Sequence, residues 1–119
     1  MKGWWEVDFV KDTVWRSEGC ERLLGVQPEK SEPSFIWWAD RLHPDDRQRT
    51  VDSFNAAQEG DADHWSAEYR MRRFNGSYGV FLDRAYIARD KTGKATRVVG
   101  AIHDITEWRH AEEERLNYQ

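Results

Sequence analysis

The sequence has few of the residues that mark a disulfide-stabilised, metal-binding or membrane-spanning protein. Its 119 residues include one cysteine and three prolines, and no apolar run is long enough to cross a bilayer. A single thiol excludes an internal disulfide and a multi-cysteine metal site. The 22 acidic and 18 basic residues give a net charge of −4, which does not favour nucleic acid as a partner. Without a signal peptide, we expect a cytoplasmic segment that inserts into no membrane itself, whether or not its parent protein is membrane-associated.

Aromatic residues are the most abundant unusual feature, with seven tryptophans in a chain long enough for one domain. Tryptophan is favoured both in cores and at contact surfaces, so the composition predicts an aromatic interior, an exposed contact surface, or both. The basic residues Arg70, Arg72 and Arg73 alternate with apolar positions. This spacing favours a solvated sheet face over a nucleic-acid site.

Residues 65–106 read as three antiparallel strands. Apolar and polar residues nearly alternate over 65–74, the period of a strand with one dry and one wet face. Asn75-Gly76 suits a two-residue hairpin in which both residues have positive φ. A strand over 78–88 follows, then a turn with Gly93, then a strand rich in β-branched residues over 96–106.

The remaining segments predict one more hairpin and four helices. Residues 4–10 and 13–15 form the hairpin, which would complete an edge of the sheet. The helices are expected after Ser17 and Ser34, from Pro44 to Gly60, and over 107–119, with residues 27–33 as a polar loop. Val51, Phe54 and Gln58 would form the buried stripe of the longest helix, and Thr106 would cap the last one.

Several motifs resemble the PAS domain family in their order along nearly the whole chain. They are Trp4-Trp5-Glu6-Val7-Asp8, Leu23-Leu24-Gly25, Leu42-His43-Pro44-Asp45-Asp46-Arg47, Asn75-Gly76-Ser77-Tyr78 and the closing Val99-Gly100-Ala101-Ile102-His103-Asp104-Ile105-Thr106-Glu107. The resemblance implies an α+β fold with a five-stranded antiparallel sheet and short helices on one face. It assigns residues 1–106 to a PAS/PAC sensor domain and 107–119 to a linker helix that leads to an effector domain.

A PAS-type fold leaves space for a small molecule between its sheet and its helices. The pocket candidates come from the helical region and the sheet: Phe35, Trp37, Trp38, Phe54, Trp65, Tyr69, Met71, Phe81 and Ile102. These residues could instead simply fill the core. With so many bulky rings, we expect a packed or small pocket rather than a large cofactor cavity.

No cofactor is predicted. Haem would need an axial ligand, and none of the four histidines lies in a persuasive context. A flavin photosensor would need its reactive cysteine in an Asn-Cys-Arg-Phe-Leu-type run, whereas Cys20 lies between Gly19 and Glu21. Cys20 therefore reads as a small apolar core residue. No metal site and no catalytic residue is predicted either, because no phosphate loop or metal-spaced histidine pair is present.

The output element implied by the resemblance is the junction between the last strand and the last helix. Its predicted relay residues are Asp104, Thr106, Glu107 and Trp108; the alternative is a plain helix cap. The ending Leu116-Asn117-Tyr118-Gln119 resembles the linker before a GGDEF domain, the cyclic di-GMP-forming domain of bacterial diguanylate cyclases. A histidine kinase effector or a ligand-free dimerisation scaffold are the alternatives. We expect a homodimer paired through the polar last helix.

Overall fold

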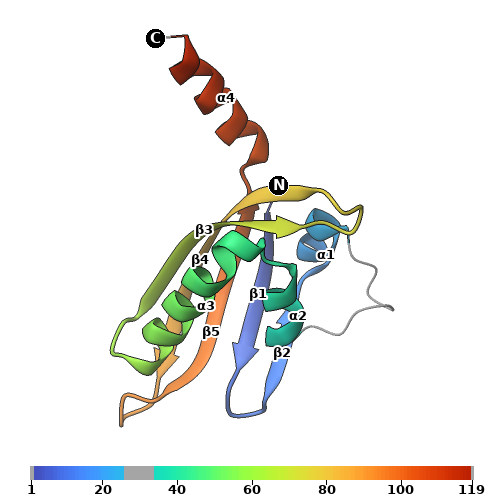
Figure 1. Cartoon of the computed structure of the whole chain (residues 1–119). Helices are drawn as coiled ribbons and strands as arrows, with labels where there is room; N and C mark the ends of the chain where they lie inside the picture. Colours follow the sequence, from blue (N-terminus) through green and yellow to red (C-terminus); the bar gives the residue numbers. More distant parts are fainter. Residues whose placement is uncertain (1, 26–33, 119) are drawn as a thin grey trace.

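The chain forms a curved five-stranded antiparallel sheet with helices on one face (Figure 1). The structure is a computed structural model that describes residues 2–25 and 34–118. The predicted loop at 27–33 lies outside the described residues. The strand order is β2-β1-β5-β4-β3, so the hairpin from the start of the chain extends the sheet beside the last strand. The strands are β1 (Lys2–Asp8), β2 (Thr13–Arg16), β3 (His64–Arg72), β4 (Tyr78–Arg89) and β5 (Ala95–Asp104).

The predicted meander over 65–106 is confirmed, but its first turn differs from the prediction. Arg72 lies opposite Tyr78, and the Arg73 N–H donates to the Ser77 carbonyl at 2.7 Å. Only Gly76 in this loop has a positive φ, at 89°. Asn75 instead accepts a hydrogen bond from the Ser77 N–H at 3.0 Å, a local turn that does not need the left-handed conformation. The predicted two-residue hairpin is therefore wrong, and residues 73–77 separate the two strands.

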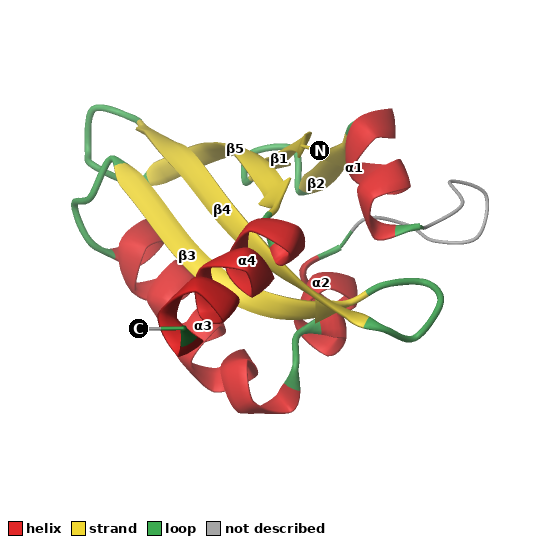
Figure 2. Cartoon of the chain, turned by 90° about the horizontal axis from the view of Figure 1, so that it is seen from above, coloured by secondary structure: helices red, strands yellow, loops and turns green. Residues whose placement is uncertain are grey.

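Three helices cover the concave face of the sheet, and each begins where the sequence predicts. These are α1 (Glu18–Leu24), α2 (Phe35–Arg41) and α3 (Pro44–Glu59), which Figure 2 shows from above. Ser17 Oγ accepts from the Cys20 N–H at 3.1 Å, and Ser34 Oγ accepts from the Trp37 N–H at 3.0 Å. Pro44 lies in the first turn of α3, where its missing N–H costs nothing.

The buried stripe of α3 differs from the predicted one. Asp46, Thr50 and Phe54 are buried, whereas Val51 and Gln58 are only partly buried. Asp46 points inward because Arg70 on β3 binds it through three hydrogen bonds of 2.8–3.0 Å. The Arg70 guanidinium holds the pKa of the Asp46 carboxyl well below its usual range. The acidic residue thus fixes α3 to the sheet as well as suiting the helix dipole.

The last helix, α4 (Thr106–Asn117), projects away from the sheet, and none of its residues is buried (Figure 1). The prediction that Thr106 caps it was wrong. Ile105 occupies the N-cap position and makes no side-chain cap bond, while Thr106 is the first helical residue. An ion pair between Arg109 and Glu68 ties the first turns of α4 to β3. No helix in the described part of the chain is long and apolar enough to cross a membrane.

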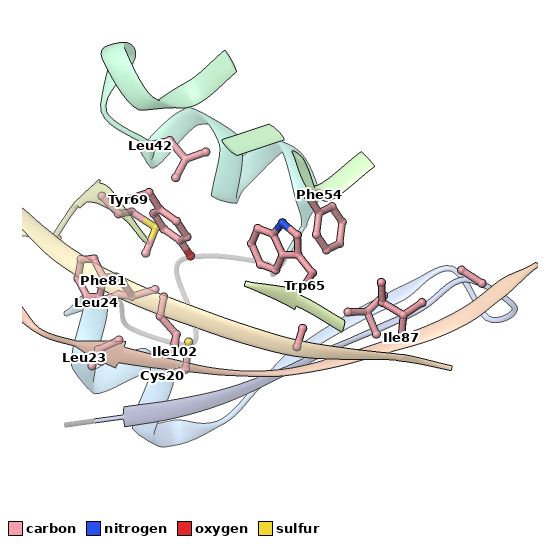
Figure 3. Packing of buried hydrophobic residues seen from close by; sticks show 14 residues of the cluster. Cys20, Leu23, Leu24, Leu42, Phe54, Trp65, Tyr69, Phe81, Ile87 and Ile102 are labelled. Carbon is pink, nitrogen blue, oxygen red and sulfur yellow. The ribbon is translucent and has the colours of Figure 1, made fainter. Parts of the chain in front are cut away.

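The core lies between the sheet and the covering helices, as Figure 3 shows. Leu23 and Leu24 come from α1, Phe54 comes from α3, and the strands supply Phe81, Ile87 and Val98 among others. The tryptophans divide between the two predicted environments. Trp65 is 5% exposed, whereas Trp4 and Trp108 are 48% and 59% exposed. The aromatic interior is therefore confirmed, and a contact surface at the exposed tryptophans stays a prediction.

Candidate functional site

A cavity of about 590 Å³ lies between the sheet and the helices, within the size range of small-molecule pockets. It is larger than the packed or small pocket that the sequence favours. All of the predicted pocket residues line it except Phe81: Phe35, Trp37, Trp38, Phe54, Trp65, Tyr69, Met71 and Ile102. Phe81 is fully buried and lies opposite Asp104 across the β4–β5 pair, so it belongs to the core near α4.

Aromatic rings from two strands and two helices form one wall of the cavity. The Phe54 and Trp65 rings lie with centroids 5.1 Å apart, and the Trp38 ring meets both of them edge-on. Figure 3 shows Phe54 and Trp65 side by side above the strands. Trp5 from β1 completes the group, and its ring centroid lies 6.3 Å from that of Phe54. Edge-to-face packing of this kind is a favoured arrangement of aromatic rings.

The polar centre of the cavity is Asp83, which the sequence analysis missed. This carboxylate on β4 is 3% exposed and accepts from Trp5 Nε1 at 2.8 Å and from the Tyr69 hydroxyl at 2.8 Å. Burial raises the pKa of Asp83 to about 7, although both hydrogen bonds oppose the rise. The only sequence feature that predicts its inward position is the alternation of side chains along β4. Asp83 lies two residues after Phe81 and therefore on the same face of the sheet.

Tyr69 links Asp83 to the helical side of the cavity. Trp38 Nε1 on α2 donates to the Tyr69 hydroxyl at 3.1 Å, and this hydroxyl donates to Asp83. Burial, together with the neighbouring Asp83 charge, raises the pKa of Tyr69 well above its ordinary value. The phenol therefore stays protonated, and three elements share one hydrogen-bonded chain.

A second buried polar pair joins β2 to α1 beside the cavity. Arg16 Nε on β2 donates to Glu21 Oε1 on α1 at 2.7 Å, and both residues are less than 10% exposed. The Arg16 guanidinium also lies over the Trp37 ring, 4.2 Å from its centroid. This cation–π contact holds Trp37 against the cavity wall. The only basic residue among the described lining residues is thus already paired.

Cys20 also lines the cavity, as a buried thiol on α1. Burial raises its pKa to about 12, so it stays a protonated, apolar group. No histidine is among the described lining residues, so the haem ligand considered from the sequence has no candidate there. Within residues 2–25 and 34–118, no group of three or more His, Cys, Asp or Glu side chains could hold a metal ion.

The junction between β5 and α4 brings two of the predicted relay residues together. Asp104 Oδ1 accepts from the Thr106 N–H at 3.0 Å and from the Thr106 hydroxyl at 2.6 Å. Thr106 Oγ1 accepts in turn from the Val80 N–H at 2.9 Å and from Arg73 Nη2 at 3.0 Å. Burial alone would raise the pKa of Asp104, but the hydrogen bonds from Thr106 and Arg73 outweigh it and lower the pKa.

The other two relay candidates lie outside this network. Glu107 and Trp108 are exposed on α4, and Trp108 contacts the guanidinium of Arg109 beside it. Arg73 was predicted to lie on a solvated basic face together with Arg70 and Arg72, and not at this junction. Both of these arginines are partly buried and ion-paired, to Asp104 and Asp46 respectively, while only Arg72 is exposed.

Comparisons with known proteins agree with this architecture. The family model described as "PAS fold" matches residues 13–102. A methyl sulfide methyltransferase-associated sensor of Methanosarcina acetivorans is 33% identical over 92% of this chain, which spans 10% of that protein.

Two solved structures share this fold. The N-terminal domain of a diguanylate cyclase with PAS/PAC sensor from Marinobacter aquaeolei superposes with a TM-score of 0.81, 26% identity and coverage of 92% of this chain and 100% of that one. A sensory box histidine kinase/response regulator from Burkholderia thailandensis gives a TM-score of 0.79, 25% identity and coverage of 98% and 86%.

Proposed function

The chain belongs to the PAS-fold family, and we propose that it is the sensory module of a larger signalling protein. In this proposal, a small molecule binds in the cavity between the sheet and helices α1–α3. Binding changes the sheet, and the change passes through α4 to an attached effector. Residues 1–106 are then the PAS/PAC domain, and 107–119 are the linker helix.

One observation carries the proposal: a single strand, β5, connects the cavity to the output helix. Ile102 lines the cavity, and Asp104, two residues later on the same strand, binds the first residue of α4. A shift of the sheet that accompanies ligand binding would therefore move the base of α4. A ligand-free scaffold would need no internal cavity, and the volume of about 590 Å³ favours sensing over that alternative.

The effector that we propose is a GGDEF-type diguanylate cyclase, which makes cyclic di-GMP. The likeness to the N-terminal domain of a diguanylate cyclase supports this choice, as does the Leu-Asn-Tyr-Gln ending of the chain. A histidine kinase is the second candidate, supported by the likeness to a sensory box histidine kinase. The chain itself contributes regulation and no catalysis.

We further propose that the module acts as a homodimer in the cytoplasm. Trp108 and Leu116 are more than half exposed on α4, and a second copy of the helix would cover them. Pairing through α4 would place two effector domains side by side, which suits a cyclase that joins two GTP molecules.

The effector is tested with the purified full-length protein, incubated with GTP or with ATP and Mg²⁺. Cyclic di-GMP formation supports the proposal, histidine autophosphorylation supports the kinase instead, and neither activity would overturn both. A Thr106→Ala variant should change the basal rate with little effect on the Michaelis constant for GTP, because it loosens the junction and leaves the effector intact. Native mass spectrometry of the same preparation measures the subunit count and any retained small molecule.

A further inference from the structure

Asp83 is a buried carboxylate with no positive partner in the described part of the chain. None of the ion pairs among residues 2–25 and 34–118 includes it. Its side-chain partners, the Trp5 indole and the Tyr69 phenol, are neutral donors, and each oxygen accepts one of them. A carboxylate can accept about four hydrogen bonds, so Asp83 retains capacity for a further donor.

The other polar residues of the cavity also favour a positive ligand. Asp8 and Asp12 lie at the turn between β1 and β2 and line the cavity, and Arg16 is engaged by Glu21. Hydrogen bonds from the backbone, chiefly that of Lys11, lower the pKa of Asp8 and keep it ionised. Asp8 and Asp12 therefore place negative charge at the cavity rim, and Asp83 adds negative charge at its centre when ionised, so an anionic ligand would meet repulsion.

The aromatic wall suits the same ligand. The negative face of an aromatic ring attracts a cation, and a cage of such rings beside a carboxylate is a common way to bind an organic ammonium group. Trp5 and Tyr69 orient the Asp83 carboxylate, while Phe54, Trp65 and Trp38 line the same space with apolar surface. A ligand with an ammonium end and an aromatic or aliphatic body would satisfy both parts of the cavity.

We propose that the cavity takes a small organic cation, an amine on an apolar body, whose ammonium group pairs with Asp83. This inference depends on the proposed ligand-binding function and specifies the class of ligand. The ammonium supplies the missing positive charge to the carboxylate, and its body lies against the rings of Phe54 and Trp65. The ammonium would favour the ionised form of the carboxylate, which burial alone disfavours, and the ion pair would stabilise the complex.

Three probes of similar size and different charge test the proposal: phenethylamine, 2-phenylethanol and phenylacetate. Isothermal titration calorimetry at pH 7.5 should find the amine bound at least about tenfold more tightly than the alcohol, with the acid weakest. Equal or tighter binding of the alcohol or the acid would overturn the cation inference, yet leave a ligand-binding cavity. Failure of all three to bind would overturn it too, and native mass spectrometry would then decide the ligand-binding function separately.

A matched pair of variants locates the charge. Asp83→Asn should reduce amine affinity about tenfold or more and leave alcohol affinity within about threefold. Asp61→Asn removes the same charge from the exposed loop between α3 and β3, outside the cavity lining, and should change amine affinity less than about threefold. Equal effects of the two substitutions would contradict the role of Asp83.

Proton release gives a test that needs no variant. The titratable groups around Asp83 are Tyr69 on β3 and Cys20 on α1, and burial keeps both protonated near neutral pH. Amine binding should therefore release a proton from Asp83 alone, and amine affinity should rise about tenfold from pH 6 to pH 8. Titration at pH 6.5 in phosphate and in MES, two buffers with different enthalpies of ionisation, measures the released proton. Binding without proton release at pH 6.5 would overturn the proposed ion pair.

Discussion

Arg73 and Asp104, which are 31 residues apart, form an ion pair of 2.9 Å between Nη2 and Oδ2 at the base of α4. The same guanidinium nitrogen donates to Thr106 Oγ1 at 3.0 Å. Arg73 follows the edge strand β3, whereas Asp104 ends β5 just before α4. The ion pair therefore connects the β3 edge of the sheet to the base of the output helix. Both side chains are less than a quarter exposed, which limits screening by solvent.

Arg73→Ala should loosen this junction. We expect a loss of about 1–3 kcal/mol in the free energy of unfolding, because Asp104 keeps its charge and loses its partner in a partly buried position. Amides in the first turns of α4 should exchange hydrogen faster in mass spectrometry. The neighbouring exposed residue provides the control, since Arg72→Ala should cost less than about 0.5 kcal/mol. Indistinguishable exchange in the two variants would contradict a role for Arg73 in holding α4.

Asp83 should make stability fall as pH rises. Its pKa is raised to about 7 by burial, so between about pH 4 and pH 7 the folded chain binds a proton that the unfolded chain releases. The free energy of unfolding therefore falls as pH rises through this window, by up to about 1 kcal/mol per pH unit. Above the window the contribution of Asp83 is constant.

Urea unfolding at pH 5, 6, 7 and 8 checks this, with Asp83→Asn as the reference. The difference in unfolding free energy between wild type and Asp83→Asn should shrink or change sign in favour of the variant as pH rises. His103, whose pKa is lowered by burial, contributes with the opposite sign but equally in both proteins. A difference that stays constant from pH 5 to pH 8 would mean that Asp83 is already ionised at pH 5.

Gly100→Ala should disturb the cavity through Trp5. Gly100 on β5 pairs with Trp5 on β1, and an added Cβ would overlap the indole atoms Cε2, Cζ2 and Nε1. Displacing the ring would break its hydrogen bond to Asp83 and cost about 2–3 kcal/mol in overpacking. Chemical denaturation and the near-ultraviolet circular dichroism of tryptophan report the change. Ala101→Ser, the next residue on the opposite face, should leave both signals close to wild type.

Removal of α4 should weaken self-association. A chain that ends after Thr106 lacks the exposed Trp108 and Leu116 and retains the sheet, so it should sediment as a monomer at concentrations where residues 1–119 form dimers. Sedimentation velocity over a concentration series measures both. A monomeric 1–119 chain at high concentration, or an unchanged dimer after truncation, would rule out pairing through this helix.

The strands and helix starts were predictable because local chemistry determines them. Ser17, Ser34 and Pro44 each begin a helix through a bond or a fixed φ that depends on neighbours in sequence. The alternation in 65–74 likewise placed Trp65 and Tyr69 on the buried face. These features require no knowledge of distant segments.

The features that sequence analysis missed depend on residues distant in the chain. Asp83 is 78 residues from Trp5, and Arg73 is 31 from Asp104, so neither partner is visible in a local window. In the sequence, Asp83 only interrupts an apolar strand. Its buried position becomes understandable once the hydrogen bonds from Trp5 and Tyr69 are known. The open volume of the cavity was also unpredictable, because composition gives the size of side chains but not the curvature of the sheet that holds them apart.

The pairing of β1 with β5 determines when the domain can fold during synthesis. Gly3 lies opposite Ile102, and Asp8 lies opposite Arg97, so the centre of the sheet joins residues from nearly opposite ends of the domain. The β3–β4–β5 meander can form from neighbouring segments, but the first hairpin has no place to dock until β5 leaves the ribosome. We therefore expect this hairpin to dock last, once the strand that it pairs with has been made.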